Sequence, residues 1–278
     1  MPAARSTTSW RPSERASPTS RRASPDPLQL KTPRPLLGGP RCGRTLMSLN
    51  LPVRDNEKLG QLLARINASV ALQTYWEASN TTAISRLHIN DHGPVHIKIM
   101  TNIALKLLRL LAAADVTPTV VSDYELEPAD AEVVVVLASC LHDVGHAIHR
   151  KDHEELSLIL AAPLIDDFLD GLYDERAAVL VKAEALHAIL THQRDIPPLT
   201  LEAGVVKVAD ALDMEAGRAR IPFSTGTPTI HSVSAMAIRK VRLSAGEKKP
   251  IRIAIEMTNS AGIFQLDNLL REKLKNST

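Results

Sequence analysis

Aromatic residues are scarce in this chain: three Phe, three Tyr and two Trp make up 3% of its 278 residues. A hydrophobic core must therefore be built from Leu, Val, Ile and Ala, and such a core favours helices. Hydrophobic residues at 44% and charged residues at 23% are ordinary values for a globular protein. The length allows one large domain or two small ones.

Cysteines and long apolar runs are also few. Only Cys42 and Cys140 occur, which excludes a disulfide framework. Cys140 lies in an apolar run and is typical of a small buried hydrophobe, which fits a reducing, cytoplasmic location. No apolar run approaches the roughly 20 residues that span a bilayer, and no secretory signal pattern begins the chain. We therefore expect no membrane as a partner.

Several motifs of well-known enzyme classes are missing as well. The sequence contains no glycine-rich P-loop and no dinucleotide-binding pattern. It also contains no GxSxG nucleophile elbow. These absences argue against the corresponding nucleotide-binding folds and give no support to a Ser or Cys nucleophile.

The net charge of +2 conceals an uneven distribution. Residues 1–46 carry nine basic and two acidic side chains, a net charge of +7, whereas the remainder carries −5. The same segment holds eight of the 18 prolines and cannot bury enough apolar surface to offset the entropy of ordering. We interpret it as a disordered tail: a targeting peptide, a nucleic-acid-binding arm or, the reading we favour, a passive extension or start-site artefact before Met47. Because the body is acidic, nucleic acid is not expected as a partner.

Helical periodicity begins after residue 47. Helices are predicted at 55–79, 94–115, 129–142, 154–171, 174–192 and 201–217, with Asp55, Asp91 or Gly93, and Thr200 as candidate N-caps. Residues 238–244 and 251–257 alternate apolar and polar side chains as the strands of a hairpin do, and 264–274 is amphipathic. The sequence thus predicts a mainly α fold: a helical domain at 47–217 and a small β-hairpin/helix cap at 218–278 packed on it.

Nine of the ten histidines fall between His88 and His192. Imidazole together with carboxylate suits divalent transition metals, and the lack of cysteine ligands argues against a structural zinc site. A single His would more often be structural, but nine in one stretch, one of them followed by Asp, weaken that interpretation.

The positions of these residues matter as much as their number. His142 and Asp143 end a helix that is apolar on all sides, and Asp210 lies inside another apolar helix with Asp213 on the same face. A carboxylate buried without a partner is costly, and a metal ion would be that partner. With His96, one turn into a third helix, the sequence offers one four-ligand set: His96, His142, Asp143 and Asp210.

The pattern H…HD…D made by these residues, with "LASCLHDVGH" and "VKVADALD", resembles the HD superfamily of metal-dependent phosphohydrolases over about residues 90–215. The resemblance implies an HD-type helical bundle whose four residues bind one divalent cation. Such a site accepts Mn, Fe, Mg, Ni, Co or Zn, so the sequence does not choose among them.

Further histidines are nominated by the resemblance to two-metal members of that superfamily. It implies a second cation at His153 and His192. His187 lies five residues before His192 on the same predicted helix, though not quite on the same face, and is either a further ligand of that cation or a hydrogen-bond partner. "HDVGHAIHRKDHEE" is similar to the triphosphohydrolase branch but spaces its last histidine two residues further. His146 is then either a phosphate contact or general acid, or a capping or surface residue. The ligation of His92 is left open because Gly93 and Pro94 separate it from His96.

Three arginines are candidate phosphate contacts. The segment after Asp210 resembles the end of the HD-like domain in exopolyphosphatase/guanosine pentaphosphatase proteins, where an Arg-bearing turn precedes a hairpin. Arg218 and Arg220 could then hold phosphate bidentately, as could Arg194 near His192. The alternative for each is a solvated basic turn.

The sequence supports two hypotheses of function. The first is a phosphohydrolase that uses one or two divalent cations to activate water against a phosphate ester or anhydride of a nucleotide or similar small molecule. The second is a regulatory module that binds metal and nucleotide with little or no turnover. A third, weaker hypothesis is nucleic-acid binding through the tail. Analogy at the level of the fold also suggests a homodimer.

Overall fold

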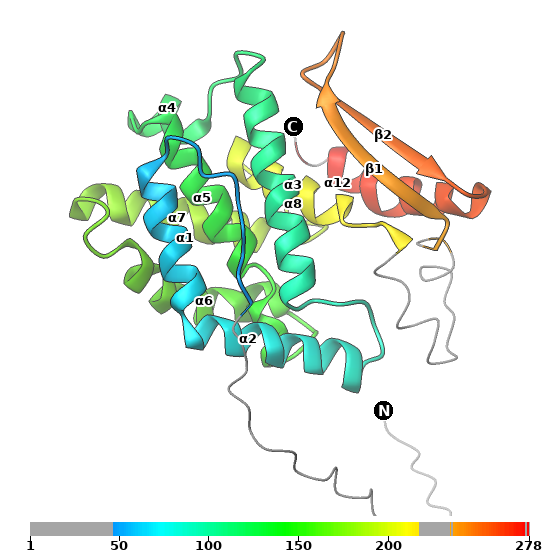
Figure 1. Cartoon of the computed structure of the whole chain (residues 1–278), viewed down its shortest axis with the longest axis horizontal. Coiled ribbons are helices and arrows are strands. Elements are labelled where there is room, and N and C mark those ends of the chain that lie inside the picture. Colours follow the sequence, from blue (N-terminus) through cyan, green and yellow to red (C-terminus); the bar gives the residue numbers. More distant parts are fainter. Residues whose placement is uncertain (1–46, 217–233, 235, 276, 278) are drawn as a thin grey trace, which may run out of the picture. The chain divides into compact units, whose positions relative to one another are not determined.

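Helices dominate the fold, and a single small sheet follows them in the described part of the chain (Figure 1). The computed structural model describes residues 47–216, 234, 236–275 and 277. The helices of the bundle are α1 (Glu57–Ala68), α2 (Val70–Asn80), α3 (Pro94–Ala112), α4 (Thr119–Tyr124), α5 (Pro128–Leu141), α6 (His153–Leu169), α7 (Glu175–Thr191) and α8 (Leu201–Leu212). A π-helix (Thr81–Arg86) follows α2, and a 3-10 turn (Val144–Ala147) follows α5. The predicted mainly α fold is confirmed.

Helix α5 is the centre of the bundle. Eleven of its fourteen residues are buried, including the run from Val133 to Leu141. A helix that is apolar on every face must be covered on every side, and α1, α3, α4, α6, α7 and α8 all contact it. The end of α5 is therefore held rigidly in the interior.

The predicted helix at 55–79 is wrong in one respect, because it is two helices. Ser69 has an extended backbone (ψ 101°), its N–H donates to the carbonyl of Ile66, and its hydroxyl accepts from the N–H of Leu72. One serine thus ends α1 and caps α2, and this local capping overrides the continuous apolar periodicity. Asn56, and not Asp55, is the N-cap of α1.

The predicted hairpin is present after the bundle. Strands β1 (Ile238–Ala245) and β2 (Ile251–Met257) pair antiparallel, with Val241 opposite Ile255. A short helical segment closes the chain as η4 (Ser260–Gly262), α11 (Ile263–Gln265), η5 (Leu266–Leu270) and α12 (Arg271–Lys275). Ile238, Leu243 and Leu270 are buried in the same hydrophobic core as the bundle, so these elements pack on it.

Helix α2 fixes the backbone that follows α5. Nε1 of Trp76 donates to the carbonyl of Cys140 at 2.8 Å, and the hydroxyl of Ser79 donates to the carbonyl of Asp143 at 3.2 Å. Both contacts are buried, and buried hydrogen bonds of this kind leave few alternative backbone positions. Cys140 itself is a buried free thiol whose pKa burial raises to about 12, as a structural cysteine requires.

Helix α6 fixes the same backbone from the other direction. The hydroxyl of Ser157 donates to the carbonyl of His142 at 2.6 Å and accepts from the N–H of Gly145 at 2.8 Å. Gly145 lies so close to α6 that a side chain cannot fit. A Cβ there would stand 2.1 Å from the carbonyl oxygen of His153 and 2.6 Å from the nitrogen of Ser157.

No helix in the described ranges has the length and apolar character needed to cross a membrane.

Substituting Gly145 tests this close packing. Gly145→Ala should lower the free energy of unfolding by about 2 kcal/mol or more, because backbone atoms must move to admit the methyl group. Gly60→Ala is the matched control. Gly60 lies inside α1, and a Cβ there would meet only Cγ1 of Val53, at 3.4 Å. That variant should be neutral or up to about 1 kcal/mol more stable. Urea unfolding followed by Trp76 fluorescence measures both, and equal stabilities would contradict the packing argument.

Candidate metal centre

The carboxylate of Asp143 lies at the centre of a buried histidine cluster where α5 ends. Six imidazole rings surround it: His92, His96, His142, His146, His153 and His192. They come from the loop before α3, from α3 itself, from the end of α5 and the 3-10 turn after it, from the start of α6 and from the end of α7. The two carboxylate oxygens face different rings, so the cluster has two halves.

Oxygen Oδ2 of Asp143 faces the first half. It lies 2.8 Å from Nδ1 of His92, 3.3 Å from Nε2 of His142 and 3.5 Å from Nε2 of His96. Oδ1 of Asp210, on α8, lies 3.5 Å from Nε2 of His96 and 3.9 Å from Nε2 of His142. The four residues predicted to hold the first cation are thus brought together by two helices, α3 and α8, and by the end of a third, α5.

Oxygen Oδ1 of Asp143 faces the second half. It lies 3.3 Å from Nε2 of His153, 3.6 Å from Nε2 of His146 and 3.7 Å from Nε2 of His192. Two of the three residues predicted for a second cation, His153 and His192, therefore share the carboxylate with the first set.

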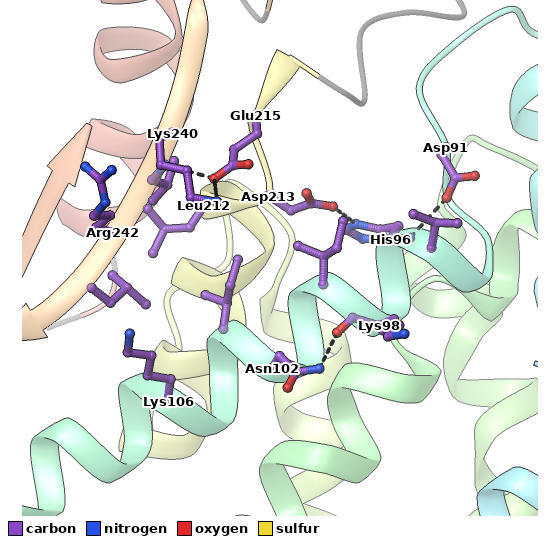
Figure 2. A pocket seen from close by; sticks show the side chains of 15 residues that line it. Asp91, His96, Lys98, Asn102, Lys106, Leu212, Asp213, Glu215, Lys240 and Arg242 are labelled. Carbon is purple, nitrogen blue, oxygen red and sulfur yellow. Dashed lines mark hydrogen bonds and ion pairs between the residues drawn. The ribbon is translucent and has the colours of Figure 1, made fainter. Parts of the chain in front are cut away.

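Two contacts position His96, one to its backbone and one to its ring. Oδ1 of Asp91 accepts from the N–H groups of Gly93 and His96, both at 3.1 Å, which caps the first turn of α3. Nδ1 of His96 lies 2.6 Å from Oδ2 of Asp213, and Figure 2 shows this contact beside the first turn of α3. The carboxylate holds the Nδ1 proton, so Nε2 presents a lone pair to the cluster.

Two more rings are oriented in the same way. Nδ1 of His142 donates to the carbonyl of Ser139 at 2.9 Å, and Nδ1 of His192 donates to the carbonyl of Ile189 at 2.6 Å. With Nδ1 protonated, each neutral ring has its Nε2 lone pair directed at Asp143. This arrangement is the one that histidine metal ligands require.

The donor atoms fit a cation. Nε2 of His96 and Nε2 of His142 lie 3.2 Å apart, and both Nδ1 atoms are bonded elsewhere, so in the neutral rings two lone pairs would face each other and need a cation or a proton between them. Against the effect of burial, Asp143 raises the pKa of His142, so the metal-free ring favours the proton. Nδ1 of His146 is buried and has no hydrogen-bond partner among the described residues. Three groups with mutually close ligand atoms share Asp143: with His92 and His146, with His96 and His142, and with His153 and His192. Imidazole and carboxylate together suit divalent transition metals.

The two carboxylates stay ionised. Burial alone would raise the pKa of Asp143, but His142, His92 and His146 hold it well below its usual range. Burial alone would also raise the pKa of Asp210, but Lys273 and then His142 hold it well below its usual range. Both groups are therefore available as anionic ligands near neutral pH.

The pKa values of the histidines differ according to their burial and their partners. Burial lowers the pKa of His146 to about 2, and burial together with His142 lowers that of His192 to about 3. Burial also disfavours the charged form of His153, but hydrogen bonds to Asp143 and Glu154 raise its pKa to about 9. Neutral imidazole is the form that binds metal, and two of the second-half rings already adopt it.

The remaining predicted residues are His187, Arg194, Arg218 and Arg220. Nε2 of His187 accepts from the N–H of Leu199 at 2.9 Å, and none of the three groups of potential ligands contains it. Arg194 is exposed, and its carbonyl accepts from Nζ of the buried Lys207. Arg218 and Arg220 lie outside the described residues.

Two contacts in the centre were not predicted from the sequence. His92 lies 2.8 Å from Asp143 because the loop before Pro94 folds back over the cluster. Lys273, on α12, forms an ion pair with Oδ2 of Asp210. The His92–x3–His96 spacing was a signal for the first, whereas the second joins parts of the chain 63 residues apart and has no local signal.

Comparison with known proteins agrees with this geometry. Residues 96–215 match the HD domain family. The uncharacterized protein MJ1020 of Methanocaldococcus jannaschii is 41% identical over 204 residues, which cover 73% of this chain and 79% of that protein. The chain belongs to the HD domain family. The predicted HD-type bundle is thereby confirmed, and no solved structure matches the chain significantly.

Membership of the HD family implies the superfamily of metal-dependent phosphohydrolases. The matched region begins at His96 and includes the HD pair and Asp210, so the cluster coincides with the part of the chain that defines the family. His92 and Lys273 lie outside that region.

Acid should destabilise the metal-free protein. His146 and His192 are neutral when folded but take up protons below about pH 6.5 when unfolded, so the unfolded state binds more protons there. The free energy of unfolding should therefore fall steadily as the pH drops from 6.5 to about 4. The raised pKa of His153 acts at higher pH. The stability that it contributes is fully present below pH 6.5 and is lost as the pH rises through about 9.

Urea unfolding at several pH values in a chelator measures this dependence. His146→Gln should flatten the acid slope, while His149→Gln, at an exposed site on the adjoining loop, should leave it unchanged. An acid slope that is the same in both variants would contradict the assignment.

Proposed function

We propose that this protein is a hydrolase of phosphate esters or anhydrides that uses two divalent cations sharing Asp143. The observation that supports it is the division of six imidazole rings between the two oxygens of one buried carboxylate. His96, His142, Asp143 and Asp210 would hold one cation, and Asp143 with His153 and His192 the other. The chemistry supplied by such cations is Lewis acidity, which lowers the pKa of water and polarises a phosphoryl oxygen.

The residues of the chain provide the rigid frame for this reaction. In hydrolysis the water oxygen bonds to phosphorus, the bond from phosphorus to the leaving oxygen breaks, and the leaving oxygen takes up a proton. Asp213, Ser139 and Ile189 fix the rings through Nδ1, so the ligand atoms need not reorganise during the reaction. The phosphate contacts at His146, Arg194, Arg218 and Arg220 stay predictions.

A nucleotide or similar small phosphorylated molecule is the substrate class we favour, with the reaction in the cytoplasm. Support comes from membership of the family and from the buried, histidine-rich centre. The decisive experiment is a screen of each divalent cation against mononucleotides, nucleoside triphosphates, cyclic nucleotides, guanosine tetraphosphate and polyphosphate.

Asp143→Asn should abolish cation binding and hydrolysis together, because it removes the charge that both halves share. We expect hydrolysis to fall by about a hundredfold or more, beyond the 10- to 100-fold typical of losing an outer partner of a ligand. Asp167→Asn, at an exposed position on α6, is the control and should match the wild type. Calorimetric titration with Mn²⁺ and phosphate release measure the two effects, and hydrolysis that survives in Asp143→Asn would refute the centre.

A cavity next to His96 favours the regulatory alternative as a second candidate. It has a volume of about 910 Å³ and lies between α3 and β1 (Figure 2), within the size range of small-ligand pockets. Apolar side chains such as Ile103, Leu212 and Val241 line it. Its lining includes His96 but none of the other proposed ligands, so a ligand in this cavity would not contact the rest of the metal centre.

The charges of this cavity suit an anionic ligand. Four cationic side chains line it: Lys98, Lys106, Lys240 and Arg242. Lys240 pairs with Glu215 and Arg242 with Glu256, so Lys98 and Lys106 provide the positive charge for a ligand. Its acidic groups are engaged, since Asp213 holds His96 and Glu215 accepts from the N–H of Val241 at 2.9 Å. A ligand wedged between α3 and β1 would press on the segment that orients His96, which is how a nucleotide could regulate the centre.

Binding of ATP in the presence of EDTA tests the regulatory alternative, because the chelator removes the cations that the metal centre needs. Lys106→Glu should weaken ATP binding by about tenfold through charge reversal in the cavity. Lys151→Glu reverses an exposed lysine far from α3 in sequence and should bind as the wild type does. Equal affinities for both variants, measured calorimetrically, would exclude the cavity as a nucleotide site.

A further inference from the structure

One side chain at the metal centre comes from beyond the C-terminal end of the matched HD region. Lys273, on α12, forms an ion pair through Nζ with Oδ2 of Asp210. The other oxygen of that carboxylate faces Nε2 of His96 at 3.5 Å and Nε2 of His142 at 3.9 Å. The ammonium group therefore stands one carboxylate away from the place of the first cation.

This ion pair lies at an open edge of the centre. The side chains of Asp210 and Lys273 are 18% and 14% exposed, whereas those of His96 and His142 are fully buried. Within this set, the carboxylate and the ammonium are thus the groups that a molecule entering from solvent can touch. An anionic phosphate is repelled by the first and attracted by the second.

Lys273 has unused hydrogen-bonding capacity. An ammonium group has three donors, and among the described residues Nζ donates only to Asp210. The helix that carries it is anchored, because η5 and α12 both pack on α8 and Leu270 is buried in the core. The remaining donors are therefore held in place beside the centre, where they can bond phosphate oxygens.

We propose that Lys273 binds the phosphate group of the substrate, so that the C-terminal helix completes the active site. This inference rests on the proposed phosphohydrolase function. The alternative is that Lys273 merely positions Asp210 for the cation. The two roles differ in what the loss of the ammonium does to cation binding.

The test uses the full chain loaded with Mn²⁺ and inorganic phosphate as the probe. The variants are Lys273→Met, which removes the charge, and Lys273→Arg, which keeps it. Lys275→Met is the matched control on the same helix, where Lys275 is exposed and pairs with Glu272. Calorimetry measures Mn²⁺ affinity, and ³¹P NMR measures phosphate binding.

Lys273→Met should bind Mn²⁺ at least as tightly as the wild type, because a positive charge near the cation is gone. Its phosphate affinity should fall by about tenfold or more, as expected for a lost charge-assisted contact. Lys273→Arg should restore most of that affinity, and Lys275→Met should behave as the wild type. Lys273→Gln repeats the test if the Met variant fails to fold.

Several outcomes would overturn the inference. Weaker Mn²⁺ binding in Lys273→Met would assign the residue a positioning role. Phosphate affinity that is unchanged in that variant, or absent in the wild type, would remove the contact altogether.

The inference and the proposed function can fail separately. Phosphate binding that depends on Lys273 in a protein that hydrolyses no substrate would refute the hydrolase and keep the contact. Hydrolysis with an unchanged KM in Lys273→Met would support the hydrolase and refute the contact between Lys273 and phosphate.

Discussion

The structure depends on keeping one carboxylate ionised in its interior. Asp143 is 3% exposed, and its charge is stabilised by six imidazole rings from separate parts of the fold. A buried carboxylate without such partners would be strongly unfavourable, so the elements that carry the rings are constrained to meet at one point. The apolar helix α5 delivers the carboxylate to that point, and α2 and α6 fix its backbone by hydrogen bonds.

A second layer of contacts turns this cluster into a set of ligands. The Nδ1 atoms of three rings are held by a carboxylate or by carbonyls near their own helix ends, which leaves each Nε2 directed inward. Because these anchors belong to rigid helices, the geometry exists before any cation or substrate arrives. The same anchors link the centre to the cavity between α3 and β1, since Asp213 belongs to both.

Periodicity and motif spacing predicted most of the bundle, the hairpin and the four core ligand candidates, because helices with apolar faces and polar residues at their buried ends leave strong local signals. The break at Ser69 was missed, since capping competes with periodicity at a single residue. His187 was nominated by its nearness to His192, but five residues along a helix turn the side chain by roughly 140°, and it contacts Leu199 instead. The contact from Lys273 could not be predicted, because it depends on how the C-terminal helix packs on α8.

The histidine cluster also has a consequence for the folding of the chain. Its residues are far apart in sequence: His96 contacts Asp213 across 117 positions and His142 across 46. A cation held by these side chains would act as a covalent-like cross-link that closes a loop of more than a hundred residues, for which the chain-entropy model of such links gives about 4.7 kcal/mol. The ion would then be a reversible staple between the first and last helices of the matched region, and its loss would loosen the bundle as well as the chemistry.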